Sequence, residues 1–199
     1  AVKAERLSVE CGLGTEDNPI FPGMHMVTSQ IAAATVTAAD LVHSGRALRA
    51  VNIAGGLHHA MPHTASGFCV YNDAAVAIRW LQQQGVGKIA YLDIDAHHGD
   101  GVQKVFYDDP SVLTISLHES PVHLFPGSGF ASEIGGENAR GSAVNVALPA
   151  TCGSGDWLRA FDAIVPDVLA AFQPEILISQ HGCDAHAQDP LTDLQLSIE

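Results

Sequence analysis

A short apolar run that ends in a dense group of carboxylates and imidazoles constrains this chain more than any other feature. Residues 88–92 read Lys-Ile-Ala-Tyr-Leu, and Asp93, Asp95, His97 and Asp100 follow closely. The run is short, apolar and preceded by glycines, as is typical of a strand buried on both faces. Ligands in open α/β sheets bind beyond the carboxyl ends of such strands. The sequence therefore predicts an α/β fold with a polar site at the end of this strand.

The polar groups beyond this strand have the chemistry of metal ligands. Asp95 and His97 alternate onto one side of an extended chain. A second apolar run, residues 176–179, leads to Asp184, so two strand ends would meet. A catalytic zinc usually takes three protein ligands and leaves a position for water, and Asp95, His97 and Asp184 are a sufficient set. The competing interpretation is that the carboxylates cap turns and His97 is an ordinary polar residue, but the combined pattern favours a metal.

A second cluster, the adjacent His58 and His59, follows a glycine pair and a predicted strand over residues 51–54. A histidine that takes a proton from metal-bound water and returns it to a leaving amine works best near a neutral pKa. A buried Asp partner fixes its tautomer, and Asp93 and Asp100 are available for that role. These histidines are therefore candidate acid–base groups.

The motifs together resemble the zinc-dependent histone deacetylases and, more closely, the bacterial acetoin-utilisation deacetylases, or AcuC-like proteins. The matching segments are residues 12–19, 55–59, 66–69, 91–101, 125–127 and 181–184. Several spaced motifs in the same order make the resemblance specific. It implies a three-layer α/β/α fold with a mainly parallel sheet, the arginase/deacetylase fold, incomplete at both ends. Residues 1–199 would then form a single partial catalytic domain.

The resemblance also implies the metals. Zinc would be bound by Asp95, His97 and Asp184, and ferrous iron could occupy the same ligands, because affinity alone does not select a metal in cells. A structural potassium ion would lie nearby, held through side-chain and backbone oxygens. The potassium ligands that the resemblance implies are Asp93, Asp95, His97, Ser116 and Leu117.

The resemblance assigns the catalytic and substrate-binding roles as well. His58 and His59 would be the tandem catalytic histidines, with Asp93 behind His58 and Asp100 behind His59. His59 would be the general base and acid, and His58 would act mainly electrostatically. A narrow channel for the acyl-lysine chain would be formed by Gly67, Phe68 and Phe125.

The implied activity is removal of acetyl groups from lysine side chains of proteins, and the implied partner is acetyl-coenzyme A synthetase. The family's catalytic Tyr follows the third metal ligand in a glycine-rich loop, so we expect this chain to be the middle of a longer deacetylase. Tyr71, Tyr91 and Tyr107 are expected to have packing roles. Two alternatives remain: an acetylpolyamine amidohydrolase, and a catalytically silent module that binds metal and acyl-lysine.

The binuclear manganese ureohydrolases are the nearest competing enzyme class, since they share this sheet and an Asp-Ala-His motif. They carry further aspartates two residues after the His and two residues after the distal Asp. This chain has Gly99 and His186 at those positions. One zinc is therefore favoured over two manganese ions, with His186 expected at the surface or behind the ligands.

Composition excludes several other classes. The chain has 9 basic and 22 acidic residues and a net charge of −13, which argues against direct nucleic-acid binding and would attract lysine-bearing substrates. No segment approaches the roughly twenty apolar residues of a membrane helix. The four Cys show no paired motif, so a reducing, cytoplasmic location is expected.

The coarse pattern predicts alternating helices and strands, hence a parallel sheet. A Gly- and Pro-rich loop over residues 118–141 is long enough to be functional. Pro166 is expected to kink or divide the last helix. The predicted helices cover residues 26–44, 72–84, 102–107 and 157–172, and Asn72-Asp73 offers an N-cap to the second of them. The predicted strands cover residues 51–54, 88–94, 112–117, 143–148 and 175–179.

Overall fold

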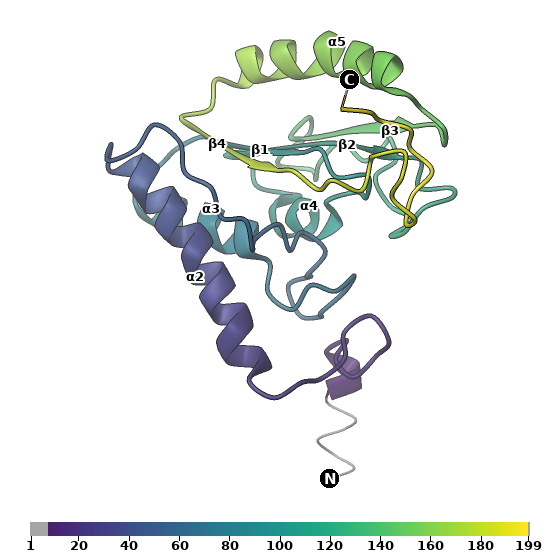
Figure 1. Cartoon of the computed structure of the whole chain (residues 1–199). Coiled ribbons are helices and arrows are strands. Elements are labelled where there is room, and N and C mark those ends of the chain that lie inside the picture. The colour runs from purple at the N-terminus through teal and green to yellow at the C-terminus, as the bar shows by residue number, and fades with distance from the viewer. Residues whose placement is uncertain (1–7, 199) are drawn as a thin grey trace. The chain divides into compact units, whose positions relative to one another are not determined.

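The computed structural model describes residues 8–198 of the 199-residue chain. It divides the chain into two compact units, Ala1–Val86 and Gly87–Glu199, here called unit 1 and unit 2. Unit 2 carries the sheet, and unit 1 carries two of the helices (Figure 1). Each unit is described by itself, and the expectation of a single partial domain stays a prediction.

In unit 1, helix α2 (Met24–His43) packs against helix α3 (Asp73–Gln83). The side chain of Asn72 accepts a hydrogen bond from the backbone N–H of Ala75 and so caps α3. This cap was predicted from the sequence and is confirmed. Such a cap satisfies one of the backbone donors that a helix leaves unpaired at its start.

The predicted strand over residues 51–54 is wrong. This segment forms a turn, and Val51 and Ile53 are exposed. Asn52 explains the difference. Its backbone carbonyl accepts a hydrogen bond from the Gly55 N–H, and its side-chain oxygen accepts one from the Ala54 N–H. Its side-chain amide also donates to the carbonyl of Ile31 in α2. These local bonds compete with a strand ladder, as Asn side chains commonly do.

Unit 2 contains a four-stranded sheet in the order β3-β2-β1-β4, and every neighbouring pair is parallel. The strands that the sequence predicted in this part of the chain are confirmed. Their bounds are Ile89–Asp93 for β1, Val112–Glu119 for β2, Ala143–Leu148 for β3 and Ile176–Gln180 for β4. Strands β1 and β2 are buried along their whole length, as expected for the interior of a parallel sheet.

Helices α4 (Asp100–Phe106) and α5 (Ser154–Phe172) lie on opposite faces of this sheet (Figure 1). Helix, sheet and helix therefore form three layers in unit 2, as predicted. The buried side chains between the sheet and α5 include Leu92, Ile115 and Trp157. Burial of this apolar face is the main favourable contribution to folding.

Pro166 does not divide α5, because the structure has one continuous helix through that position; the kink that the sequence also allowed stays a prediction. Proline removes one backbone hydrogen bond. Trp157 and Val165, both before Pro166, are buried in the core, and Val168 and Leu169 after it pack against the same core. Packing on both sides of the proline therefore keeps the two halves in one helix.

The register of the sheet positions the polar segments that follow it. Asp93, the last residue of β1, pairs with Gln180, the last residue of β4. The chain after each strand therefore starts from the same edge of the sheet. In residues 8–198, no helix is long and apolar enough to cross a membrane.

Candidate metal centre

Two hydrogen bonds, each donated by a backbone N–H of the turn after β1, join this turn to the end of β4 and to the turn that follows β4. The N–H of Ile94 donates to the carbonyl of Gln180 at 3.1 Å. The N–H of Ala96 donates to Oδ1 of Asp184 at 3.0 Å. These bonds hold together two segments that are almost ninety residues apart in the sequence.

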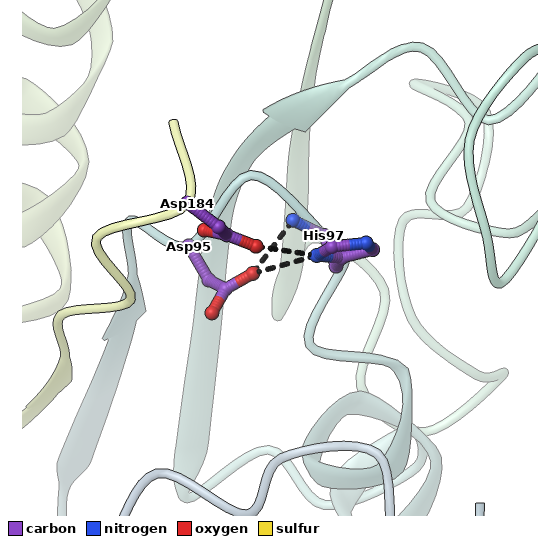
Figure 2. A group of neighbouring side chains, drawn as sticks. All are labelled: Asp95, His97 and Asp184. Carbon is purple, nitrogen blue, oxygen red and sulfur yellow. Dashed lines mark hydrogen bonds and ion pairs between the residues drawn. The ribbon is translucent and has the colours of Figure 1, made fainter. Parts of the chain in front are cut away.

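Asp95, His97 and Asp184 converge where these two turns meet, as the sequence predicted (Figure 2). Nδ1 of His97 lies 2.6 Å from Oδ2 of Asp184 and 3.1 Å from Oδ1 of Asp95. One ligand atom from each residue can be chosen so that all lie within 4.8 Å of one another. Two carboxylates and one imidazole are a donor set that zinc accepts, with a coordination position left for water.

Asp95 and Asp184 also have hydrogen-bond partners besides the His97 ring. The Asp95 carboxylate accepts the His97 N–H at 2.8 Å and the side-chain amide of Gln180 at 2.9 Å. The carbonyl of Asp184 accepts the Thr192 hydroxyl at 2.6 Å. Outer partners of this kind fix the orientation of metal ligands. Gly182 completes the support, because a Cβ at this position would overlap the Asp95 carboxylate.

The two carboxylates change the basicity of the imidazole. Burial by itself lowers the pKa of His97. The hydrogen bonds from His97 to Asp184 and Asp95, together with their negative charges, outweigh burial and raise this pKa from 6.5 to about 10. Without a metal, the His97 ring is therefore protonated at neutral pH and neutralises part of the carboxylate charge.

Asp93 and Asp100 lie in the same unit as the ligands. Asp93 is fully buried; its carboxylate accepts the Tyr91 hydroxyl at 2.7 Å and the Asp95 N–H at 3.2 Å. Asp100 is buried at the start of α4. Tyr91 lies in a strand as expected, but its hydroxyl does more than pack, because it fixes one oxygen of Asp93. This bond was not predictable from the sequence.

The tandem histidines belong to unit 1, where His58 and His59 are buried with ring centroids 4.0 Å apart. The side-chain amide of Asn72 donates to the carbonyls of His58 and Ala60, at 3.1 Å each. A Cβ on Gly67 would lie 2.5 Å from Cδ2 of His59, so only glycine leaves room for this ring. The pairing of His58 with Asp93 and of His59 with Asp100 stays a prediction.

Asp73 is a buried residue of unit 1 that the sequence reasoning missed. Its carboxylate accepts the N–H groups of Gly56 and Leu57 and the hydroxyl of Thr35. It thereby fixes the turn that leads into His58. Its place beside the Asn72 cap was visible in the sequence, but its partners sixteen or more residues upstream were not.

The remaining predicted residues occupy varied surroundings. Ser116 and Leu117 are buried in β2, and the Ser116 hydroxyl lies 2.8 Å from Nδ1 of His118. Phe125 is 44% exposed, and its ring centroid lies 6.4 Å from that of His97. Phe68, in unit 1, is 70% exposed and has a positive φ of 67°. The potassium site and the channel stay predictions.

A ureohydrolase would need ligands for a second metal ion, and the described residues contain no second group of converging ligands. A Cβ at Gly99 would overlap the Asp93 carboxylate, so a side chain there has no room. His186 uses Nδ1 to accept the N–H of Gln188 at 3.2 Å. It is not one of the three residues that converge. The prediction of one metal ion stays a prediction.

Comparison with known proteins agrees with the resemblance to histone deacetylases. The sequence matches the histone deacetylase domain over residues 1–199. It is 49% identical to the acetoin utilization protein AcuC of Bacillus subtilis (strain 168) over 187 residues, which cover 94% of this chain and 48% of that protein. It is 41% identical to AcuC of Staphylococcus aureus (strain MRSA252) over 195 residues, covering 98% and 50%. The chain thus spans about half the length of these curated relatives.

Two solved structures confirm the fold. A crystal structure of an HDAC homolog from Aquifex aeolicus has a TM-score of 0.89 and 36% identity, covering 94% of this chain and 50% of that chain. An HDAC homolog complexed with SAHA has a TM-score of 0.90 and 36% identity, covering 96% and 51%.

Metal binding should release a proton. Since the pKa of His97 is raised to about 10, a metal ion must displace the proton from this ring at any lower pH. Calorimetric zinc titration at pH 7 in buffers of different ionisation enthalpy should therefore show release of about one proton per ion, and tighter binding as the pH rises. Binding that releases no proton and is independent of pH would contradict this account of His97.

Gly182→Ala should weaken metal binding, because the added Cβ must displace the Asp95 carboxylate. Loss of one well-placed supporting contact typically costs about 10- to 100-fold in metal affinity. Gly155→Ala in α5 is the matched control, since nothing lies near a Cβ there. Equal zinc affinities of the two variants would show that Gly182 does not position the ligand.

Proposed function

The chain belongs to the histone deacetylase family, and from this premise we propose that it carries the metal-binding core of a zinc-dependent hydrolase that removes acetyl groups from lysine side chains of proteins. The convergence of Asp95, His97 and Asp184 is the observation that carries the proposal. These residues come from two strand ends that only the folded sheet brings together.

The donor set fits a catalytic ion better than a structural one. Structural zinc sites are usually closed by four protein ligands, whereas catalytic sites keep three and an open position. The three converging residues are the only such group in the described part of the chain. A bound zinc ion would supply Lewis acidity and a water molecule whose pKa lies near neutrality; ferrous iron is the second candidate.

Histidines and aspartates of this chain would carry out the proton transfers. We assign His59 as the group that accepts a proton from the attacking water and donates it to the leaving lysine amine. His58 stabilises negative charge that develops during the reaction. Asp93 and Asp100 would orient His58 and His59, and the burial of both carboxylates suits that role. A carboxylate behind an imidazole fixes its tautomer and orientation.

The substrate proposal depends on the shape and charge of the surroundings. Gly67, Phe68 and Phe125 would line a slot for the four-carbon lysine chain, and the edge contact of the Phe125 ring with His97 supports this role for Phe125. The net charge of −13 would draw cationic protein segments toward the site. An acetylated protein, with acetyl-coenzyme A synthetase as one candidate, is the proposed partner, and the cytoplasm is the proposed location.

His59→Ala tests the proton-transfer role. In the whole protein loaded with zinc, this change should lower kcat on an acetyl-lysine peptide by about 10²- to 10⁴-fold, the usual contribution of general acid–base catalysis. Zinc stoichiometry should remain unchanged, because His59 is not among the ligands. His63→Ala, an exposed histidine of the same unit, should retain wild-type kcat.

Three results would change the proposal. An unchanged kcat in His59→Ala would refute the assignment of the general base. A higher kcat/KM on acetylputrescine than on the acetyl-lysine peptide would replace the protein substrate with a polyamine. Zinc binding without turnover of either substrate would favour a silent acyl-lysine-binding module.

A further inference from the structure

A buried polar network in unit 2 lies outside the three metal ligands. It joins α4 and the strands β2 and β3 to the segment between those two strands. The side chains of His98, Gln103, His118 and Asn145 are buried, and Glu133 reaches them from the connecting segment. Buried polar groups are costly unless they are hydrogen-bonded, so the bonds within this network favour one arrangement of its parts, although Oδ1 of Asn145 has no partner among the described residues.

Glu133 and Gln103 form the middle of this network. The Gln103 amide donates to Oε2 of Glu133 at 2.9 Å. Oε1 of Glu133 accepts the N–H groups of Gly129 and Phe130 at 2.9 and 3.0 Å. The Asn145 amide donates to Oε1 of Gln103 and to the Glu133 carbonyl, at 2.8 and 3.0 Å. One carboxylate thus closes the turn around Gly129 and ties it to α4.

Two imidazoles secure the other side of the same turn. Nε2 of His118 donates to the carbonyl of Gly129 at 2.9 Å, and Nε2 of His98 donates to Oε1 of Gln103 at 3.1 Å. Nδ1 of His98 then accepts the Ser128 hydroxyl at 3.0 Å. Burial lowers the pKa of both rings, that of His118 to about 4 with a further contribution from His98. Both rings are therefore neutral at pH 7, which matches these donor and acceptor roles.

Gly129 lies against the His98 and His118 rings, with no room for a side chain. Its φ is +94°, and a Cβ there would lie 2.5 Å from Nε2 of His118 and 2.6 Å from Cγ of His98. The ring centroids of His98 and His118 are 4.8 Å apart. The backbone of the turn is therefore fixed by contact as well as by hydrogen bonds.

This network connects directly to the metal centre at both ends. His98 is the residue after the ligand His97, and Phe125 comes three residues before Ser128. The Phe125 ring approaches the His97 ring edge-on, with centroids 6.4 Å apart. The segment from Phe125 to Phe130 is thus held against the turn that carries the ligands.

We infer that Glu133, with the buried groups it binds, is a positioning residue that sets where Phe125 stands beside the metal centre and thereby governs substrate binding. The inference rests on the proposed function for the identity of the substrate. Glu133 touches neither the ligands nor the proposed acid–base histidines in the described contacts. Its loss should therefore weaken binding of the acyl-lysine chain while leaving metal loading and the chemical step in place.

Glu133→Gln is the direct test, with Glu137→Gln on the same segment as an exposed, matched control. The glutamine side chain has one acceptor oxygen and an –NH2 donor, so it cannot accept from the two backbone N–H groups and from the Gln103 amide at the same time, as the two carboxylate oxygens do. In the zinc-loaded whole protein, Glu133→Gln should raise KM for an acetyl-lysine peptide about fivefold or more with kcat nearly unchanged, as expected when binding alone is lost. Hydrogen exchange of the Gly129 and Phe130 amides should accelerate, and Glu137→Gln should match wild type in both measurements.

The readouts separate this inference from the proposed function. Unchanged exchange of the two amides in Glu133→Gln, or an unchanged KM despite faster exchange, would overturn the inference. If Glu133→Gln lowered kcat while zinc loading and KM stayed unchanged, the inference would also be overturned, because Glu133 would then act on the chemical step and not on substrate binding. A wild-type protein inactive on acetyl-lysine would contradict the proposed function instead, and amide exchange would still decide whether Glu133 holds the segment.

Discussion

The parallel pairing of β1 with β4 is the constraint on which the metal centre depends. It sets Asp93 beside Gln180, and the turns that follow bring the carboxylates of Asp95 and Asp184 to one imidazole. Two carboxylates at this range repel each other unless a cation lies between them. The protonated His97 supplies part of that charge, and a divalent ion would supply more. The folded sheet therefore creates one position at which a bound cation is electrostatically favoured.

Both units hold a functional segment in the same way, with a carboxylate that accepts backbone N–H groups from a turn. Asp73 does so for the turn before the tandem histidines, and Glu133 does so for the turn after Phe125. Hydrogen bonds to an ionised acceptor are the stronger kind. Loops that would otherwise be mobile are in this way fixed to helices and strands, which keeps reactive groups within the small tolerances that catalysis requires.

The sequence predicted most of the sheet and the convergence of Asp95, His97 and Asp184, because local patterns marked the strand ends from which these residues follow. Apolar runs ending in Asp or His marked β1 and β4, and Asn72 marked a helix start. The strand over residues 51–54 failed because local bonds from Asn52 outweighed an apolar pattern. The roles of Asp73, Tyr91 and Glu133 were not predictable, since each depends on a partner that only the tertiary structure supplies.

Elemental analysis of the purified whole protein, beside its Asp184→Asn variant, tests the central claim most directly. The account predicts about one zinc ion per chain in the wild type, as expected for three protein ligands and one open position, and a large loss of zinc in the variant. Two manganese ions per chain would indicate a binuclear site and contradict the proposal. Zinc retained in full by Asp184→Asn would show that the metal is bound elsewhere.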